Sequence, residues 1–181
     1  AHKTGAAFAD YGAHIIHGAA NAMYLPKVIA YNAKDPTAKA RYGVIADKMH
    51  LGGGNDDEKV ALLIQYLRGM NDDLNIPHCI GHYGPDSYPA EQGFVPENVF
   101  LERLPEIAKN AIADACTGSN PRQPTQEEME KLLKCCYYDT EVDFNHRPSA
   151  APASRRMICP GHKLLWPGLF AAAKVGKILA I

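Results

Sequence analysis

Apolar side chains recur every three or four residues along most of the first 140 residues, which is the period of an amphipathic helix. The runs with this pattern follow His17, Asp35, Asn55, Pro96 and Thr125. No stretch shows the strict alternation of apolar and polar residues that a half-buried strand requires. The pattern therefore predicts an all-α helical bundle over residues 1–144.

Polar residues ahead of these runs predict where helices begin. Asp35 precedes Pro36, which is the order of an N-cap and a first helical residue. Asn55 and Thr125 are each followed by Glu at the third position, the spacing of a capping box. We expect three helices to start at these points.

Glycine and proline predict breaks. The run Gly52 to Gly54 is expected to end the helix that begins at Pro36, with a glycine in the left-handed C-cap position. Pro26 and Pro105 lie inside helical runs. Pro26 is expected to kink its helix or to split it near Leu25, and Pro105 is expected to divide its run into a short and a longer helix. Residues 1–16 are expected to form a loop or one helical turn, and residues 71–95 a loop-rich excursion.

Charge divides the chain at Asp143. The residues up to this point carry 13 basic and 20 acidic side chains, a net charge of −7, whereas the remainder carries six basic residues and no acid. We interpret 145–181 as an unrelated basic tail, a linker with a possible short helix. Two lysines in that helix are too few to make membrane contact the expected role, and the acidic front disfavours nucleic-acid binding.

Composition places the chain among ordinary globular proteins. It has 181 residues, of which 46% are hydrophobic and 22% charged, enough for one domain with its own core. The five cysteines include no CxxC pair, so disulfides are not expected. Neither a signal peptide nor a long apolar span is apparent, and a cytoplasmic location is the expectation.

Histidine offers the clearest candidate chemistry among the eight imidazoles of the chain. His14 and His17 are three residues apart, and neutral imidazole is a common ligand of iron and zinc. The H-x-x-H spacing alone favours capping or surface histidines over a metal site. The case for His17 as a metal ligand is strengthened by Gly18 and Ala19, because these small residues allow other groups to approach closely. His78 and His82 have no carboxylate at a matching spacing, and we expect them at the surface.

Three segments carry a resemblance to a known family. They read AHKTGAAFADYGAHIIHGAANAMYLPKVIAYNAKDP, RYGVIADKMHLGG and CTGSNPRQPT followed by EMEKLLKCCYYD. Together they resemble the C-terminal helical domain of iron-containing (group III) alcohol dehydrogenases, especially the alcohol dehydrogenase part of the bifunctional aldehyde-alcohol dehydrogenases. The likeness covers Ala1 to Phe144, and its most specific part is His17 to Asn21.

The resemblance implies an activity and its cofactors. Members of the family hold Fe²⁺, sometimes Zn²⁺, with one Asp and three His, and the metal polarises the oxygen of an alcohol or aldehyde. Hydride passes to NAD, or from NADH to an aldehyde. The implied role is reduction of short aldehydes such as acetaldehyde in fermentation.

Two residues of this chain match functional positions of the family. His17 matches the last metal ligand, and His2 matches a histidine near the metal and the nicotinamide that can relay a proton, so His2 is the catalytic candidate. His14 falls in an insertion and receives no ligand role. The other ligands would precede Ala1, and the nucleotide-binding domain, which holds most of the NAD, is absent. We therefore expect a fragment that is inactive alone.

Two further segments are assigned structural roles. Asn120 to Arg122 matches the family's return toward the active-site cleft, but a rigid loop between two helices is the favoured interpretation. Cys116 is expected to be an inert buried thiol.

A second function remains open beside the enzyme. The chain could be a non-catalytic helical module for interaction or assembly, because a domain without its partner exposes an apolar face. Relatives of the bifunctional type build long oligomers, so a homo-oligomer is the expected state.

Overall fold

The computed structural model describes residues 1–84 and 95–143, and all of them that form regular structure are helical. The expected all-α fold is confirmed for this part of the chain, whereas the predictions for the tail 145–181 lie outside the described residues. The α-helices are α1 (His2–Ala7), α2 (His17–Asn32), α3 (Pro36–Lys48), α4 (Asp56–Asp73), α5 (Glu97–Ile112) and α6 (Gln126–Tyr138). Single 3₁₀ turns lie at Ala9–Tyr11, Ile80–His82 and Thr117–Ser119.

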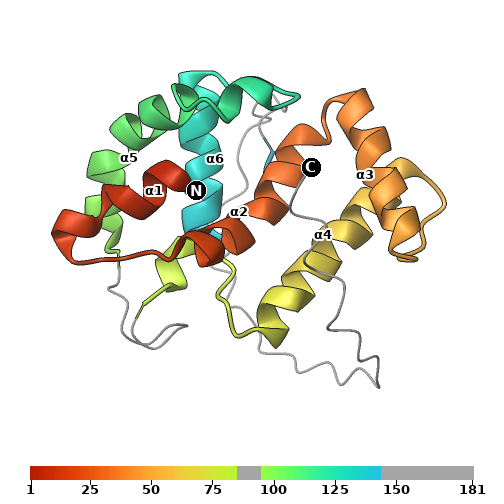
Figure 1. Cartoon of the computed structure of the whole chain (residues 1–181), viewed down its shortest axis with the longest axis horizontal. Helices are drawn as coiled ribbons and strands as arrows, with labels where there is room; N and C mark the ends of the chain where they lie inside the picture. The colour runs from red at the N-terminus through yellow and green to blue at the C-terminus, as the bar shows by residue number, and fades with distance from the viewer. Residues whose placement is uncertain (85–94, 144–181) are drawn as a thin grey trace, which may run out of the picture. The chain divides into compact units, whose positions relative to one another are not determined.

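Helix α2 lies between two groups of helices (Figure 1). On one side it packs with α1, α5 and α6 around a larger core, and on the other side it packs with the α3–α4 pair around a smaller one. Phe100 and Met23 are almost fully buried in the first core, and Ala46 and Leu63 in the second. Because α2 contributes to both, its first residue, His17, is positioned by the whole bundle.

The predicted helix starts are confirmed. Asp35 accepts a hydrogen bond from the Ala38 N–H at 2.8 Å, and Thr125 and Glu128 form the reciprocal capping box. The Asn55 side chain accepts from the Glu58 N–H at 2.9 Å, but the Glu58 carboxylate accepts from the backbone N–H of Gly54 instead of that of Asn55.

Neither internal proline splits its helix: α2 runs through Pro26, and α5 runs through Pro105, whose predicted division of the run into two helices is wrong. Pro26 cannot donate to the Ala22 carbonyl, and the side-chain amide of Asn71 in α4 donates to it instead at 3.0 Å. The lost helix bond is replaced from a neighbouring helix, and α2 continues. Pro105 lies on the exposed side of α5 with Leu101, where water can reach the released carbonyl.

The glycine run does not cap α3, which is a second correction. The helix ends at Lys48, and His50 adopts the left-handed conformation with φ of 57°. Leu51 N–H donates to the Ala46 carbonyl at 3.0 Å and closes the helix before the first glycine is reached. Gly53, at φ of 98°, lies where a Cβ would stand 3.0 Å from the backbone nitrogen of Lys59. The glycines therefore serve the tight loop into α4.

A partly buried ion cluster ties three helices together at the end of α6. Asp139 lies 2.7 Å from both Lys27 of α2 and Arg68 of α4. Burial of the Asp139 carboxylate acts to raise its pKa, but the hydrogen bonds from Arg68 and Lys27 outweigh it and hold the pKa at about 2. Asp139 therefore remains charged over the whole ordinary pH range.

Within residues 1–84 and 95–143, no helix combines the length and apolarity that crossing a bilayer demands.

Candidate functional site

The two histidines singled out by sequence lie together. Their rings stack with centroids 4.5 Å apart and planes 8° from parallel, although fifteen positions separate them in the chain. His2 begins α1 and His17 begins α2, and both side chains are exposed. The fold therefore presents two imidazoles side by side on an open surface, where ring nitrogens are accessible to a ligand or metal.

The segment between α1 and α2 brings the rings together through buried anchors. Phe8, Ala13 and Ile15 are each at most 2% exposed, and Gly12 turns the chain with φ of 88°. Gly5 allows α1 to approach this segment closely, since a Cβ there would stand 3.3 Å from the Ile15 carbonyl oxygen. The insertion that holds His14 is thus folded back on the core and fixes the entry to α2.

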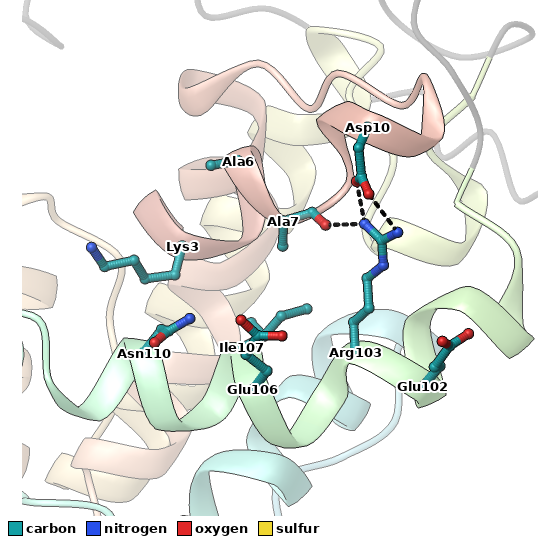
Figure 2. A pocket seen from close by; sticks show the side chains of 9 residues that line it. All are labelled: Lys3, Ala6, Ala7, Asp10, Glu102, Arg103, Glu106, Ile107 and Asn110. Atoms are coloured by element: carbon teal, nitrogen blue, oxygen red, sulfur yellow. Dashed lines mark hydrogen bonds and ion pairs between the residues drawn. The ribbon is translucent and has the colours of Figure 1, made fainter.

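Arg103 of α5 binds the C-terminal end of α1. Its guanidinium donates to the carbonyl oxygen of Ala7 at 2.5 Å and pairs with both carboxylate oxygens of Asp10 (Figure 2). The helix that carries His2 is therefore tied to α5 at its last residue. Sequence reasoning did not foresee this clamp, because Arg103 and Asp10 are far apart in the chain and have no motif around them.

His17 has one close polar neighbour. The Asn21 side-chain amide lies 3.0 Å from Nε2 of His17, one helical turn further along. A Cβ built on Gly18 would meet nothing within 4 Å, so the space beside Gly18 is open. The specific sequence from His17 to Asn21 thus supplies an imidazole, an adjacent amide and an uncrowded glycine between them.

The turn after α5 adds two groups beside His2 that sequence reasoning missed. A ring nitrogen of His2, a carboxylate oxygen of Asp114 and the sulfur of Cys116 all lie within 4.8 Å of one another. The Cys116 N–H donates to Asp114 at 3.0 Å and, together with Lys3, lowers the pKa of that carboxyl. Cys116 is exposed, so the expectation of a buried thiol is wrong. The only indication of these two residues in the sequence was the neighbouring segment CTGSNPRQPT, which resembles the family.

The loop that follows is held in place by side-chain contacts. The carboxamides of Asn32 and Asn120 donate to each other's oxygens at 2.9 and 2.8 Å. Arg122 stacks 4.0 Å above the Tyr31 ring and pairs with Glu128 at 2.7 Å. These contacts hold the loop to the far end of α2.

A separate cavity of about 550 Å³ lies between α1 and α5. Figure 2 shows the side chains of Lys3, Asp10, Arg103 and Glu106 around it, and the lining contains no imidazole or thiol. We therefore place the candidate chemistry at His2 and His17 and not in this cavity.

The other histidines discussed from the sequence lie outside the stacked pair. His78 lies 2.7 Å from Asp72 and is partly buried, so the expectation that it lies at the surface is met only in part. His82 is exposed, as expected, and His14 is exposed ahead of α2. The roles assigned to His2 and His17 stay predictions.

The architecture and the exposed histidine pair define a helical domain with an open, imidazole-bearing face. Residues 1–137 match the family model described as "Fe-containing alcohol dehydrogenase family, C-terminal". The chain belongs to the Fe-containing alcohol dehydrogenase family, of which it contains the C-terminal helical domain.

Individual relatives support the same assignment. The chain is 44% identical over 144 residues to the NADPH-dependent butanol dehydrogenase of Clostridium saccharobutylicum, a match that covers 80% of this chain and 33% of that protein. It is 33% identical over 171 residues to the bifunctional aldehyde-alcohol dehydrogenase of Escherichia coli K12, covering 84% of this chain and 18% of the other. The 1-propanol dehydrogenase of Citrobacter freundii is 30% identical over 136 residues, covering 74% and 33%. The chain therefore spans a third or less of the length of these relatives.

Proposed function

We propose that this chain is the metal-binding part of an alcohol dehydrogenase that reduces short aldehydes, acetaldehyde among them, with a nicotinamide dinucleotide. The observation that carries the proposal is the stacked pair of His2 and His17 on an exposed face. Family membership supports the chemistry, because the family model is that of iron-containing alcohol dehydrogenases.

The residues present fit one part of an iron site. His17 offers a nitrogen lone pair at the first turn of α2, with open space beside Gly18, and the Asn21 amide can rotate away from the ring. Imidazole is a usual ligand of divalent iron and zinc. A tight site needs three or four protein ligands in fixed geometry, so the other ligands would come from polypeptide beyond this chain.

Iron would supply Lewis acidity toward the substrate oxygen, and the dinucleotide would supply the reducing equivalents. His17 would hold the metal through a ring nitrogen. His2 lies against His17 and would deliver a proton to the substrate oxygen from its own ring nitrogen, or accept one in the reverse direction.

The test uses this chain joined to the region of the butanol dehydrogenase that precedes its matched segment. The chimera should contain about one iron per chain and oxidise NADH or NADPH with acetaldehyde or butanal. We propose NADH as the preferred donor, and the assay compares both because that relative is NADPH-dependent by name. The 181-residue chain alone should show no turnover.

His17→Ala in the chimera should remove the iron and lower activity by at least about a hundredfold, the scale typical of losing essential catalytic electrostatics. His82→Ala is the matched control, because His82 is an exposed histidine outside the pair. If His17→Ala keeps both iron and full activity, the ligand assignment is wrong.

We also propose that the chain associates with itself. Several large apolar side chains are exposed, among them Leu74 at 59%, Val44 at 53% and Leu25 at 37%. Contact with another copy would remove such apolar surface from water, which favours association. Light scattering should show a dimer or larger species, and a monomer across a wide concentration range would count against assembly.

A further inference from the structure

Three side chains of different ligand chemistry converge where α1 meets the turn after α5. His2 supplies an imidazole, Asp114 a carboxylate and Cys116 a thiol, and one ligand atom from each lies within 4.8 Å of the other two. The residues are distant in the sequence, since more than a hundred positions separate His2 from Asp114. Their proximity is a product of the packing of α1 on α5.

The spacing is close to that of a tetrahedral metal site. Bonds of roughly 2.0–2.3 Å to nitrogen, oxygen and sulfur place the ligand atoms of zinc about 3.3–3.8 Å apart. The present separations, all within 4.8 Å, exceed this by at most an ångström or so, a distance that rotation of exposed side chains can close. A nitrogen, oxygen and sulfur set suits Zn²⁺, whereas Mg²⁺ and Ca²⁺ prefer oxygen alone.

Two of the three groups are already oriented. The His2 ring is restricted by stacking on His17, and the Asp114 carboxylate is held by the backbone N–H of Cys116 at 3.0 Å. Lys3 is one competing cation, whose ammonium lies 3.5 Å from the second Asp114 oxygen, and the α-ammonium of Ala1 also interacts with Asp114. The Lys3 side chain is 46% exposed and can turn into water when a metal binds.

We propose that His2, Asp114 and Cys116 form a zinc-binding site with its fourth position open to solvent. On binding, the Cys116 S–H bond breaks, its proton leaves to water and the thiolate sulfur bonds to Zn²⁺. The site does not contain His17 and stands whether or not His17 holds iron. One consequence rests on the proposed function: zinc on His2 blocks the proton relay, so zinc inhibits the enzyme.

The binding test is a Co²⁺ titration of the 181-residue chain carrying Cys159→Ser. Co²⁺ occupies zinc sites and gives a thiolate charge-transfer absorption in the near ultraviolet. We expect one Co²⁺ per chain with this absorption, and displacement by Zn²⁺. Cys116→Ser should abolish the absorption, and His2→Ala and Asp114→Asn should each weaken binding at least tenfold. Circular dichroism should show that all variants keep their helices, since His2 and Cys116 are exposed.

Two controls separate this site from other sources of binding. His17→Ala removes the ring on which His2 stacks but no ligand of the zinc site. The thiolate absorption should therefore persist at saturating Co²⁺, which distinguishes the site from the proposed iron site. A chain extended by two residues at its N-terminus should bind equally, because the α-amine of Ala1 adjoins His2. The proposal is overturned if no thiolate absorption appears, if it survives Cys116→Ser, if it is lost with His17→Ala, or if it requires the α-amine.

In the chimera, zinc should inhibit aldehyde reduction, and Cys116→Ser should relieve that inhibition at least tenfold. If the chimera is inactive while the 181-residue chain still binds Co²⁺ through Cys116, the proposed function fails and the zinc site stands.

Discussion

The side-chain amide of Asn71 donates to the carbonyl oxygen of Ala22, the one acceptor in α2 from which Pro26 withholds a backbone donor. Asn71 is 5% exposed, so this bond is made away from water. A proline and a buried asparagine on different helices therefore form one structural unit, and their substitutions should not be additive.

Asn71→Ala should destabilise the protein by about 1–3 kcal/mol, because the Ala22 carbonyl loses its partner. In a Pro26→Ala background, the new backbone N–H can bond to the same carbonyl. The cost of Asn71→Ala should then fall by half or more. Chemical denaturation of the two single variants and the double variant measures the coupling, and strict additivity would exclude the relationship.

The Asp139 cluster predicts a pH dependence of stability. The Asp139 carboxyl has a pKa of about 2 in the folded protein, against about 3.9 for an unfolded aspartate. A lowered folded pKa stabilises the protein above the unfolded value, and this contribution declines as the pH falls from about 4 to about 2.

Asp139→Asn should therefore cost about 2 kcal/mol at pH 7, and the difference from the parent chain should shrink steadily below pH 4. Asparagine tolerates the left-handed backbone that Asp139 adopts, so the substitution tests charge and not conformation. Denaturation curves at a series of pH values supply the measurement. An equal cost at pH 7 and pH 2 would show that charge is not responsible.

Two glycines should respond oppositely to alanine. A Cβ on Gly81 would stand 2.7 Å from the backbone oxygen of Tyr137, so Gly81→Ala should destabilise by about 1–3 kcal/mol. Gly69 lies inside α4 with nothing within 4 Å of its Cβ position. Gly69→Ala should stabilise by about 0.5–1 kcal/mol. Thermal or chemical denaturation should give opposite signs, and a shared sign would contradict this packing of the 3₁₀ turn on α6.

Thiol reactivity should single out Cys116 among the described cysteines. Cys79, Cys135 and Cys136 are at most 5% exposed, and burial raises the pKa of Cys136 to about 12. In a Cys159→Ser background, a chromogenic disulfide reagent should modify one thiol quickly in the native protein and the other three only on unfolding. Cys116→Ser should remove the fast phase. A fast phase that persists would show that another thiol is accessible.

Much of the helical architecture could be predicted because its signals are local. The caps at Asp35 and Thr125 depend on residues three positions away, and the apolar period of each helix is visible within a few turns. Pro26 and Pro105 do not split their helices, because the outcome depends on what surrounds the freed carbonyl. For Pro26 the deciding residue, Asn71, is 45 positions away.

The candidate site was predictable only in part. His17 carried a motif, and the resemblance pointed to His2, but nothing in the sequence indicates that their rings stack. Asp114 and Cys116 could not be assigned because their relation to His2 arises from tertiary packing. Local pattern predicts helices, whereas a site built across helices requires the fold.

The reciprocal pair of Asn32 and Asn120 has a consequence for the chemical durability of the loop. Asparagine loses its amide when the next peptide nitrogen attacks the side-chain carbonyl and closes a cyclic imide. After Asn120 that nitrogen belongs to Pro121 and has no hydrogen to lose. After Asn32 it belongs to Ala33, whose N–H is engaged with the Ile29 carbonyl at 2.8 Å. The two asparagines of this pair therefore lie at positions where spontaneous deamidation during prolonged storage should be slow.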